Sequence, residues 1–212
     1  MGQTTRCLTA VYGRMPTLIT TLLILGSFAV VSPIPVAANP QDKKMLIDDF
    51  FRPGLVSALG TAWRGVSDRV MGGVSRESVS RSTEDGRPSL HLQGDVRLEN
   101  NGGFIQAELN LATDGRPLDA SVYRGIRLMV RGNGETYSLH LRTPDNVRPW
   151  QSYRAEFTAG EDWQSIDLPI DGLAPYRLDA PLDVSRLGRL GFVAIGRAFS
   201  ADVMVSSISF YR

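Results

Sequence analysis

The sequence predicts an all-β fold in which two antiparallel sheets pack face to face as a β-sandwich. From residue 45 onward no long helical period is present, and short runs instead alternate apolar and polar residues, which is typical of half-buried strands. Gly, Pro, Asn or Asp bounds each run, and short strands at such spacing favour a sandwich or a barrel. The runs cover residues 45–51, 89–93, 104–111, 125–131, 136–143, 152–157, 163–169, 190–196 and 203–211.

The alternation also assigns side chains to faces, because successive residues of a strand point to opposite sides. In the run 136–143, Leu139 and Leu141 are expected to face the core. His140 and Arg142 then lie on the other face, which is left for solvent or a ligand. The same reasoning places His91 outward on its own strand.

Gly132-Asn133-Gly134 separates two of the runs. Asn-Gly between alternating runs favours a tight primed turn, because both residues tolerate positive φ. We therefore expect a β-hairpin here, with Val130 and Tyr137 on adjacent strands. A dinucleotide-binding fingerprint would need a third glycine and a following helix, whereas this chain continues directly into a strand.

The N-terminal 38 residues have the order of a secretory signal peptide. Two arginines precede an apolar run over 18–31, and small residues follow at 36–38. The run is shorter than the roughly 20 apolar residues that span a bilayer. We expect cleavage after Ala38, export to the periplasm or another extracytoplasmic compartment, a linker over 39–44 and a single domain over 45–212. An uncleaved anchor and an organelle transit peptide are the alternatives.

Composition excludes several function classes. The net charge of +1 and the pI near 7.9 do not provide the basic surface of a nucleic-acid-binding protein. The single cysteine, Cys7, lies within the expected signal peptide, so the mature chain would have neither a disulfide nor a thiolate metal site. Zinc would need a third ligand beside His91 and His140, and no further His or Cys remains. We expect no metal and no cofactor.

No residue is predicted to be catalytic. None of the serines lies in a Gly-x-Ser-x-Gly elbow. A carboxylate pair for glycoside cleavage depends on distance in space, which leaves Glu99, Glu108, Glu135 and Glu156 open as candidates. Asp48-Asp49 opens the first strand, where an acid can contribute to a calcium site; solvated acids at a strand end are the alternative.

Two glycine-rich segments are more specific than composition explains. One runs from Trp63 to Ser75 and contains Ser-Asp-Arg-Val-Met-Gly-Gly, and the other, 98–104, reads Leu-Glu-Asn-Asn-Gly-Gly-Phe. Glycine permits positive φ and close approach of other groups, and Asp68 and Asn101 are suited to cap turns with their side chains. Two interlocking turns that the fold requires are one interpretation. A binding surface that includes Asp68, Arg69 and Asn101 is the other.

These segments resemble the family named after complex I intermediate-associated protein 30. The resemblance continues in order from about Leu46 to Tyr211. The resemblance implies a galactose-binding-like jelly roll, which is the fold of many carbohydrate-binding modules. The mitochondrial members of the family are non-enzymatic assembly factors for respiratory complex I. The export signal departs from a mitochondrial presequence. The motif positions matched here are Trp63, Ser67, Asp68, Met71, Gly72, Gly73, Gly102, Gly103, Phe104, Gly132 and Gly134.

We therefore predict an exported, non-catalytic binding or scaffold module that aids assembly or stability of a membrane or envelope protein complex. Its partner would be a membrane-associated protein and not nucleic acid. The alternative is a carbohydrate-binding module whose site on the concave sheet face combines Trp150, Tyr153, His140 and Arg142. Flat aromatic rings stack on sugars while Arg and His donate to hydroxyls. Trp150 also fits a purely structural role, as a loop residue that covers one end of the sandwich.

Overall fold

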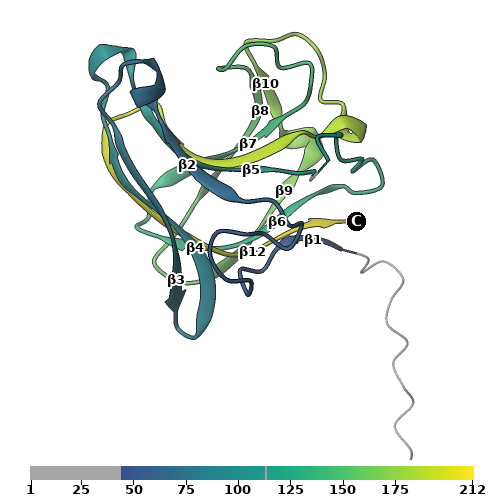
Figure 1. The fold of residues 1–212 in the computed structure, drawn as a ribbon, viewed down its shortest axis with the longest axis horizontal. Helices are drawn as coiled ribbons and strands as arrows, with labels where there is room; N and C mark the ends of the chain where they lie inside the picture. Colours follow the sequence, from purple (N-terminus) through teal and green to yellow (C-terminus); the bar gives the residue numbers. More distant parts are fainter. Residues whose placement is uncertain (1–43, 113) are drawn as a thin grey trace, which may run out of the picture. The chain divides into compact units, whose positions relative to one another are not determined.

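The computed structural model describes residues 44–112 and 114–212. The expected signal peptide and nearly all of the expected linker lie outside the described residues. Within the described part, two six-stranded antiparallel sheets form two layers (Figure 1). No helix there has the length and apolar character that crossing a membrane requires.

The two sheets are named after a central strand of each. The β12 sheet has the order β3-β4-β12-β6-β9, with β1 paired to β12, and the β7 sheet has the order β10-β8-β7-β11-β5-β2. The β12 sheet consists of β1 (Met45–Asp48), β3 (Arg76–Glu84), β4 (Arg87–Val96), β6 (Gly125–Gly132), β9 (Gln164–Pro169) and β12 (Phe199–Tyr211). The β7 sheet consists of β2 (Trp63–Ser67), β5 (Phe104–Asn110), β7 (Thr136–Arg142), β8 (Ser152–Thr158), β10 (Ala174–Tyr176) and β11 (Arg189–Ile195).

Four 3₁₀ turns connect the strands of the described chain. They are η2 (Asp68–Met71), η3 (Glu99–Asn101), η4 (Ile170–Gly172) and η5 (Val184–Arg186). The first two carry the glycine-rich segments.

The core lies between the facing surfaces of the two sheets. Leu139 and Leu141 are completely buried there, as the alternation predicts. Trp63 stacks on Phe192 of the same sheet, with ring centroids 5.6 Å apart. Burying such apolar surface is the main favourable term in folding. The prediction of an antiparallel two-sheet sandwich is therefore confirmed.

The predicted hairpin at Gly132-Asn133-Gly134 is wrong. β6 pairs with β12 and β9, whereas β7 pairs with β8 and β11, so the turn leads from one sheet to the other. Gly134 has a φ of 82°, but Asn133 does not share the positive φ that a type I′ turn needs at both residues. Asn133 instead accepts a hydrogen bond from the Tyr137 hydroxyl and donates to the carbonyl of Ser200. A local Asn-Gly signal predicts a reversal without specifying which sheet the next strand joins.

β3 is a strand that the hydrophobic pattern of the sequence did not predict. It is an edge strand of the β12 sheet and has mainly polar side chains, so it lacks the apolar alternation of the other strands. Asp85 and Gly86, both with positive φ, join it to β4 in a two-residue turn. This Asp-Gly pair was the available signal for the hairpin.

Candidate binding groove

Asp68 joins the two glycine-rich segments. Its side chain is fully buried, and its carboxylate accepts hydrogen bonds from Ser75 N at 2.9 Å and Gly103 N at 2.6 Å. The Ser75 hydroxyl also donates to it, and Phe104 N donates at 3.4 Å. Burial raises the pKa of Asp68, but these hydrogen bonds lower it by more, so the pKa lies below its usual value. The carboxylate is thus enclosed by protein donors and is not exposed to a partner.

The glycines of the two pairs have different tasks. Gly72 and Gly103 adopt positive φ, at 93° and 125°. Gly73 and Gly102 leave room for Asp68, because a Cβ at Gly73 would lie 2.3 Å from Oδ1 and one at Gly102 would lie 2.4 Å from Oδ2. Since two turns share one carboxylate, the segments interlock.

The outer side of these turns carries exposed apolar side chains. Val70 is 76% exposed, Met71 57% and Leu98 51%. Arg69 and Asn101 are exposed beside them. We call these five residues the motif corner.

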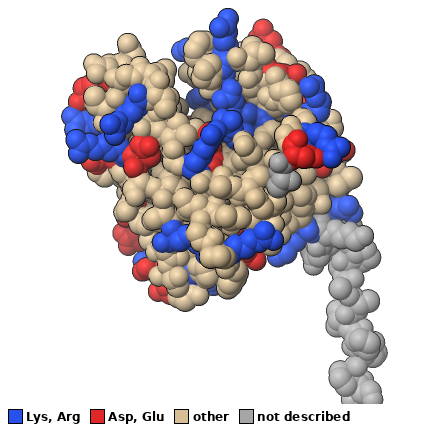
Figure 2. Space-filling view, viewed as in Figure 1, with Lys and Arg blue, Asp and Glu red and all other residues tan. Residues whose placement is uncertain are grey.

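A groove of about 400 Å³ hollows the outer face of the β7 sheet. Val70, Met71 and Asn101 of the motif corner border it on one side, and β10 and the loop after β7 border it on the other. Figure 2 shows a blue band of cationic side chains running into a hollow of the surface between the η2 and η3 turns and the β10 region. The polar and aromatic side chains that line the groove include Glu108, His140, Arg142, Trp150, Ser152, Arg154, Tyr176 and Arg189.

One cross-strand rung forms the floor of the groove. Gly191 pairs with His140 on one side and with Glu108 on the other, and Arg154 follows beyond His140. Gly191 contributes no side chain, and a Cβ there would meet no atom closer than 3.5 Å. The floor is therefore open between His140 and Glu108.

The acid of the floor, Glu108, is already neutralised. Its buried carboxylate accepts from Arg64 at 2.5 Å and from Arg189 at 3.0 Å. A glycosidase of the usual kind needs two carboxyl groups about the bond it cleaves. Glu108 is the only acid that lines this groove within the described residues, and Glu99, Glu135 and Glu156 are not part of it. The groove does not supply a glycosidase carboxylate pair.

Two half-buried arginines on the opposite side of the floor have no acidic partner within the described chain. Arg142 donates to the carbonyls of Asn146, Arg148 and Pro149. Burial and the nearby Arg189 lower the pKa of Arg142, although Glu108 counteracts this. These backbone contacts hold the guanidinium in place without neutralising its charge.

Arg154 is fixed in a comparable way. It donates to the Ser152 hydroxyl and the Trp150 carbonyl, and its guanidinium carbon lies 3.5 Å from the ring centroid of Tyr176. Burial lowers the pKa of Arg154 more than Tyr176 raises it. The Arg154 guanidinium therefore faces the groove stacked on Tyr176, and no carboxylate of the described residues pairs with it.

His140 lies between these arginines. It is only 9% exposed, and its Nε2 has no hydrogen-bond partner among residues 44–112 and 114–212. Burial lowers the pKa of His140 to about 3, and the charges of Arg154 and Arg142 add to the effect. The ring is therefore neutral at neutral pH. The sequence placed His140 on the correct face, but the structure covers it.

The two predicted aromatic residues have different positions. Trp150 is 46% exposed and lines the groove, as expected for a ligand contact. Tyr153 does not, because it is fully buried in the core and its hydroxyl donates to the carbonyls of Ala180 and Pro181. The alternation along β8 points Ser152 and Arg154 into the groove and Tyr153 away from it. Arg154 is the residue that this rule would have identified.

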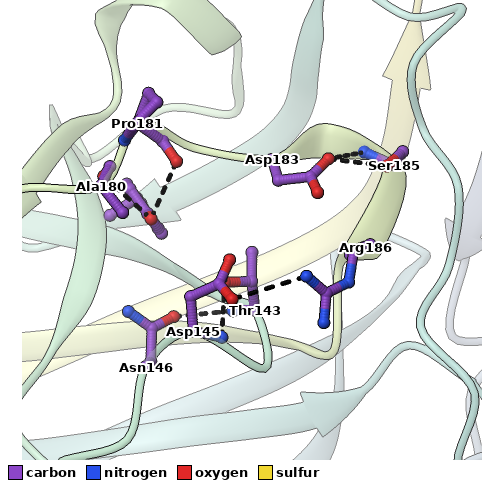
Figure 3. A network of polar contacts seen from close by, with 9 residues as sticks. Thr143, Asp145, Asn146, Ala180, Pro181, Asp183, Ser185 and Arg186 are labelled. Carbon is purple, nitrogen blue, oxygen red and sulfur yellow. Dashed lines mark hydrogen bonds and ion pairs between the residues drawn. The ribbon is translucent and has the colours of Figure 1, made fainter.

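A polar network fixes the loop that carries Trp150 (Figure 3). Thr143 N donates to Asn146 Oδ1 at 2.7 Å, and Arg186 approaches Asp145 at 3.5 Å. Asp183 caps η5 by accepting from Ser185 N. Because these contacts hold the loop against the segment before β11, the backbone that carries Trp150 is fixed by hydrogen bonds and an ion pair.

The sequence profile of the complex I intermediate-associated protein 30 family matches residues 56–202, more than half of the chain. The chain belongs to this family. No curated protein matches the sequence significantly.

In this family member, the motif tryptophan serves the core. Trp63 Nε1 donates to Asp48 Oδ2 at 2.7 Å, and Phe50 N and Ala58 N donate to Oδ1. The carboxylate considered for calcium thus accepts three protein hydrogen bonds. No group of three or more His, Cys, Asp or Glu residues in the described chain is arranged to hold a metal. His91 Nε2 lies 2.7 Å from Asp202 Oδ1 in the β12 sheet, whereas the groove is on the β7 sheet.

Solved structures of similar fold include carbohydrate-binding modules. The family 11 module of the cellulosomal cellulase Lic26A-Cel5E of Clostridium thermocellum has a TM-score of 0.60 at 15% identity, over 79% of this chain and 94% of that one. The family 11 module from Clostridium thermocellum in complex with a β-1,3-1,4-mixed-linked tetrasaccharide has a TM-score of 0.60 at 16% sequence identity, and the match covers 79% of this chain and 95% of that one. The family 30 module of the cellulosomal cellulase Cel9D-Cel44B of Clostridium thermocellum has a TM-score of 0.56 at 19% sequence identity, and the match covers 79% of this chain and 96% of that one. These likenesses confirm the galactose-binding-like jelly roll.

Proposed function

We propose that this chain is an exported, non-catalytic binding module that supports the assembly or stability of a membrane-associated protein complex. The observation that carries the proposal is the motif corner, where Val70, Met71 and Leu98 are all more than half exposed. Gathered apolar side chains on a protein surface are typical of contact sites. The family's description as intermediate-associated proteins supports a protein partner.

The way the corner is built also favours docking. Asp68 fixes both turns from the inside, and Asn100 Nδ2 donates to the Gly72 carbonyl across them. A surface that is already ordered loses little conformational entropy when it binds. Export rests on the signal-peptide order of the first 38 residues. Intact-mass analysis of protein from the host is expected to give a chain that begins at Asn39.

A quantitative capture experiment tests the protein partner. The protein and its Val70→Ser/Met71→Ser variant are used as baits on solubilised host membranes, with Val122→Ser as a control because Val122 is also exposed, at 59%, outside the motif corner. We expect the double variant to lose the partners that the control retains, with unchanged melting temperatures. Arg69→Ala adds a charge test at the same corner. Equal capture by the double variant and the control would refute the proposal.

Saccharide binding in the groove is the second candidate function. The groove combines the exposed ring of Trp150 with the side-chain donors Arg142 and Arg154. A module of the same fold is known in complex with a mixed-linked tetrasaccharide. Calorimetric titration with tetrasaccharides tests this function, and Gly191→Val, which fills the open floor, is expected to abolish binding. Binding that survives Gly191→Val would place the saccharide elsewhere.

A further inference from the structure

We propose that the part of the groove formed by Arg142, His140 and Arg154 binds the carboxylate of an acidic saccharide, such as a uronic acid unit. This inference rests on the second candidate function, saccharide binding, and specifies its ligand class. It depends on three features of the described residues: two arginines without an ion pair, a buried His140 nitrogen without a hydrogen bond, and the position of Glu108 on the groove floor.

The first feature is an uncompensated charge. Arg142 and Arg154 are both half-buried, and within the described chain neither forms an ion pair, whereas Arg64 and Arg189 share Glu108. Both guanidinium groups are held by backbone carbonyls, a hydroxyl or an aromatic ring. Charged groups removed from water are normally paired. The end of the groove formed by Arg142 and Arg154 is therefore suited to bind an anion.

The second feature is His140. Its Nε2 is buried on the groove face beside both arginines, and no residue in the described part of the chain forms a hydrogen bond with it. Buried polar atoms are nearly always satisfied in folded proteins, so an unpaired one requires an explanation. A neutral imidazole that carries its proton on Nε2 would donate to a carboxylate oxygen. A ligand carboxylate would satisfy this atom and both cations together.

The planar, forked guanidinium favours a carboxylate, because its parallel N–H groups match two coplanar oxygens. The location favours a saccharide over a peptide. Strand backbone groups under the groove are already paired within the β7 sheet, so a peptide could not add itself as a further strand there. Side-chain donors and the exposed ring of Trp150 remain, and these are the groups that bind sugars.

Glu108 gives the site a direction. It lies across the open position of Gly191 from His140, and its carboxylate already engages Arg64 and Arg189, so the cations on that side of the groove are paired. The acidic unit is therefore expected at the Arg154 end, with the next sugar units extending over Gly191 towards Glu108. Neutral hydroxyls can donate to Glu108, which already accepts from arginines.

The test compares ligands of one length by calorimetry, with the protein as its host produces it. The acidic probes are tetrasaccharides of galacturonate, mannuronate and hyaluronan, and the neutral probes are cellotetraose and a β-1,3-1,4-linked tetrasaccharide. An acetylated tetraglutamate peptide provides the same carboxylates on a peptide. We expect at least one uronate to bind about tenfold or more tightly than either neutral probe. This binding should weaken as salt is raised.

Three variants locate the site. Arg154→Met is expected to lower the affinity for the uronate about tenfold or more and to leave neutral probes unaffected. Arg87→Met removes the same charge at an exposed position of β4, outside the groove, and should bind like the wild type. Gly191→Val should abolish all saccharide binding. Melting curves establish that each variant is folded, and Gly191→Val still tests the location if Arg154→Met does not fold.

The outcomes separate the inference from the function on which it rests. Neutral binding without any preference for uronates would overturn the carboxylate site and leave saccharide binding standing. Failure of all the saccharides to bind would overturn both. Tighter binding of tetraglutamate than of every uronate would also overturn the inference and assign the groove to a protein ligand.

Discussion

Asp68 Oδ2 accepts a hydrogen bond of 2.6 Å from the backbone N–H of Gly103, 35 residues further along the chain. The same carboxylate accepts from Ser75, so one buried acid joins both motif segments. The apolar side chains of the motif corner stand directly outside this junction. Stability and partner binding are therefore expected to depend on different residues of the same motif.

The close packing around Asp68 makes one prediction for the glycines. Gly73→Ala should lower the free energy of unfolding by about 1–3 kcal/mol, because the added Cβ would lie 2.3 Å from Asp68 Oδ1. Urea denaturation measures the change. Gly172→Ala is the matched control, since no atom lies within 4 Å of its added Cβ and its φ is not positive. We expect that control to stay within about 0.5 kcal/mol of the wild type. Equal stability of both variants would refute the packing argument.

Asp68→Asn tests the hydrogen bonds themselves. Asparagine keeps one acceptor oxygen but directs an NH₂ group at backbone donors, so we expect a loss of about 1–3 kcal/mol at neutral pH. Because the folded pKa of Asp68 lies below the ordinary value of 3.8, its stabilisation is present above pH 3.8 and is lost as the pH falls through the folded value. The difference between wild type and variant should narrow under those acidic conditions. A difference that stays constant with pH would contradict the assignment.

The lowered pKa of His140 predicts a second pH dependence of the free energy of unfolding. Its folded pKa is lowered from 6.5 to about 3, so between these values the unfolded chain binds a proton that the folded chain does not. Stability should therefore fall as the pH drops through that window, by at most about 1.4 kcal/mol for each pH unit. His140→Gln removes this contribution. Urea denaturation at several pH values should show wild type losing stability relative to the variant, and parallel curves would refute the buried neutral histidine.

Trp150 and Tyr153 should respond in opposite ways. Trp150→Ala is expected to weaken binding of a groove saccharide roughly fivefold or more and to leave the melting temperature unchanged, because Trp150 is 46% exposed and lies outside the core. Tyr153→Phe should leave saccharide binding unchanged and cost about 0.5–1.5 kcal/mol, since it removes the buried bonds to Ala180 and Pro181. Calorimetry and denaturation separate the two effects. A binding loss in Tyr153→Phe would contradict its core position.

The fold class, the face of most strands and the family could all be predicted from the sequence. Alternation places Leu139 and Leu141 in the core and His140 and Arg142 on the opposite face, because the side-chain period of a strand is fixed by its backbone. The same rule would have excluded Tyr153 from the groove had it been applied to β8. The Asp85-Gly86 turn was an equally local signal for the β3–β4 hairpin.

The pairing of the strands and the burial of the polar groups could not be predicted from the sequence, because they depend on long-range packing. The turn at Asn133 joins different sheets, because core packing and not turn chemistry selects the sheet that β7 enters. Asp68 is buried by contacts with Gly103, and His140 is buried beside Arg154 of the neighbouring strand, with no hydrogen-bond partner for its Nε2 among the described residues. Burial and hydrogen bonding depend on these long-range contacts, so no local pattern specifies them.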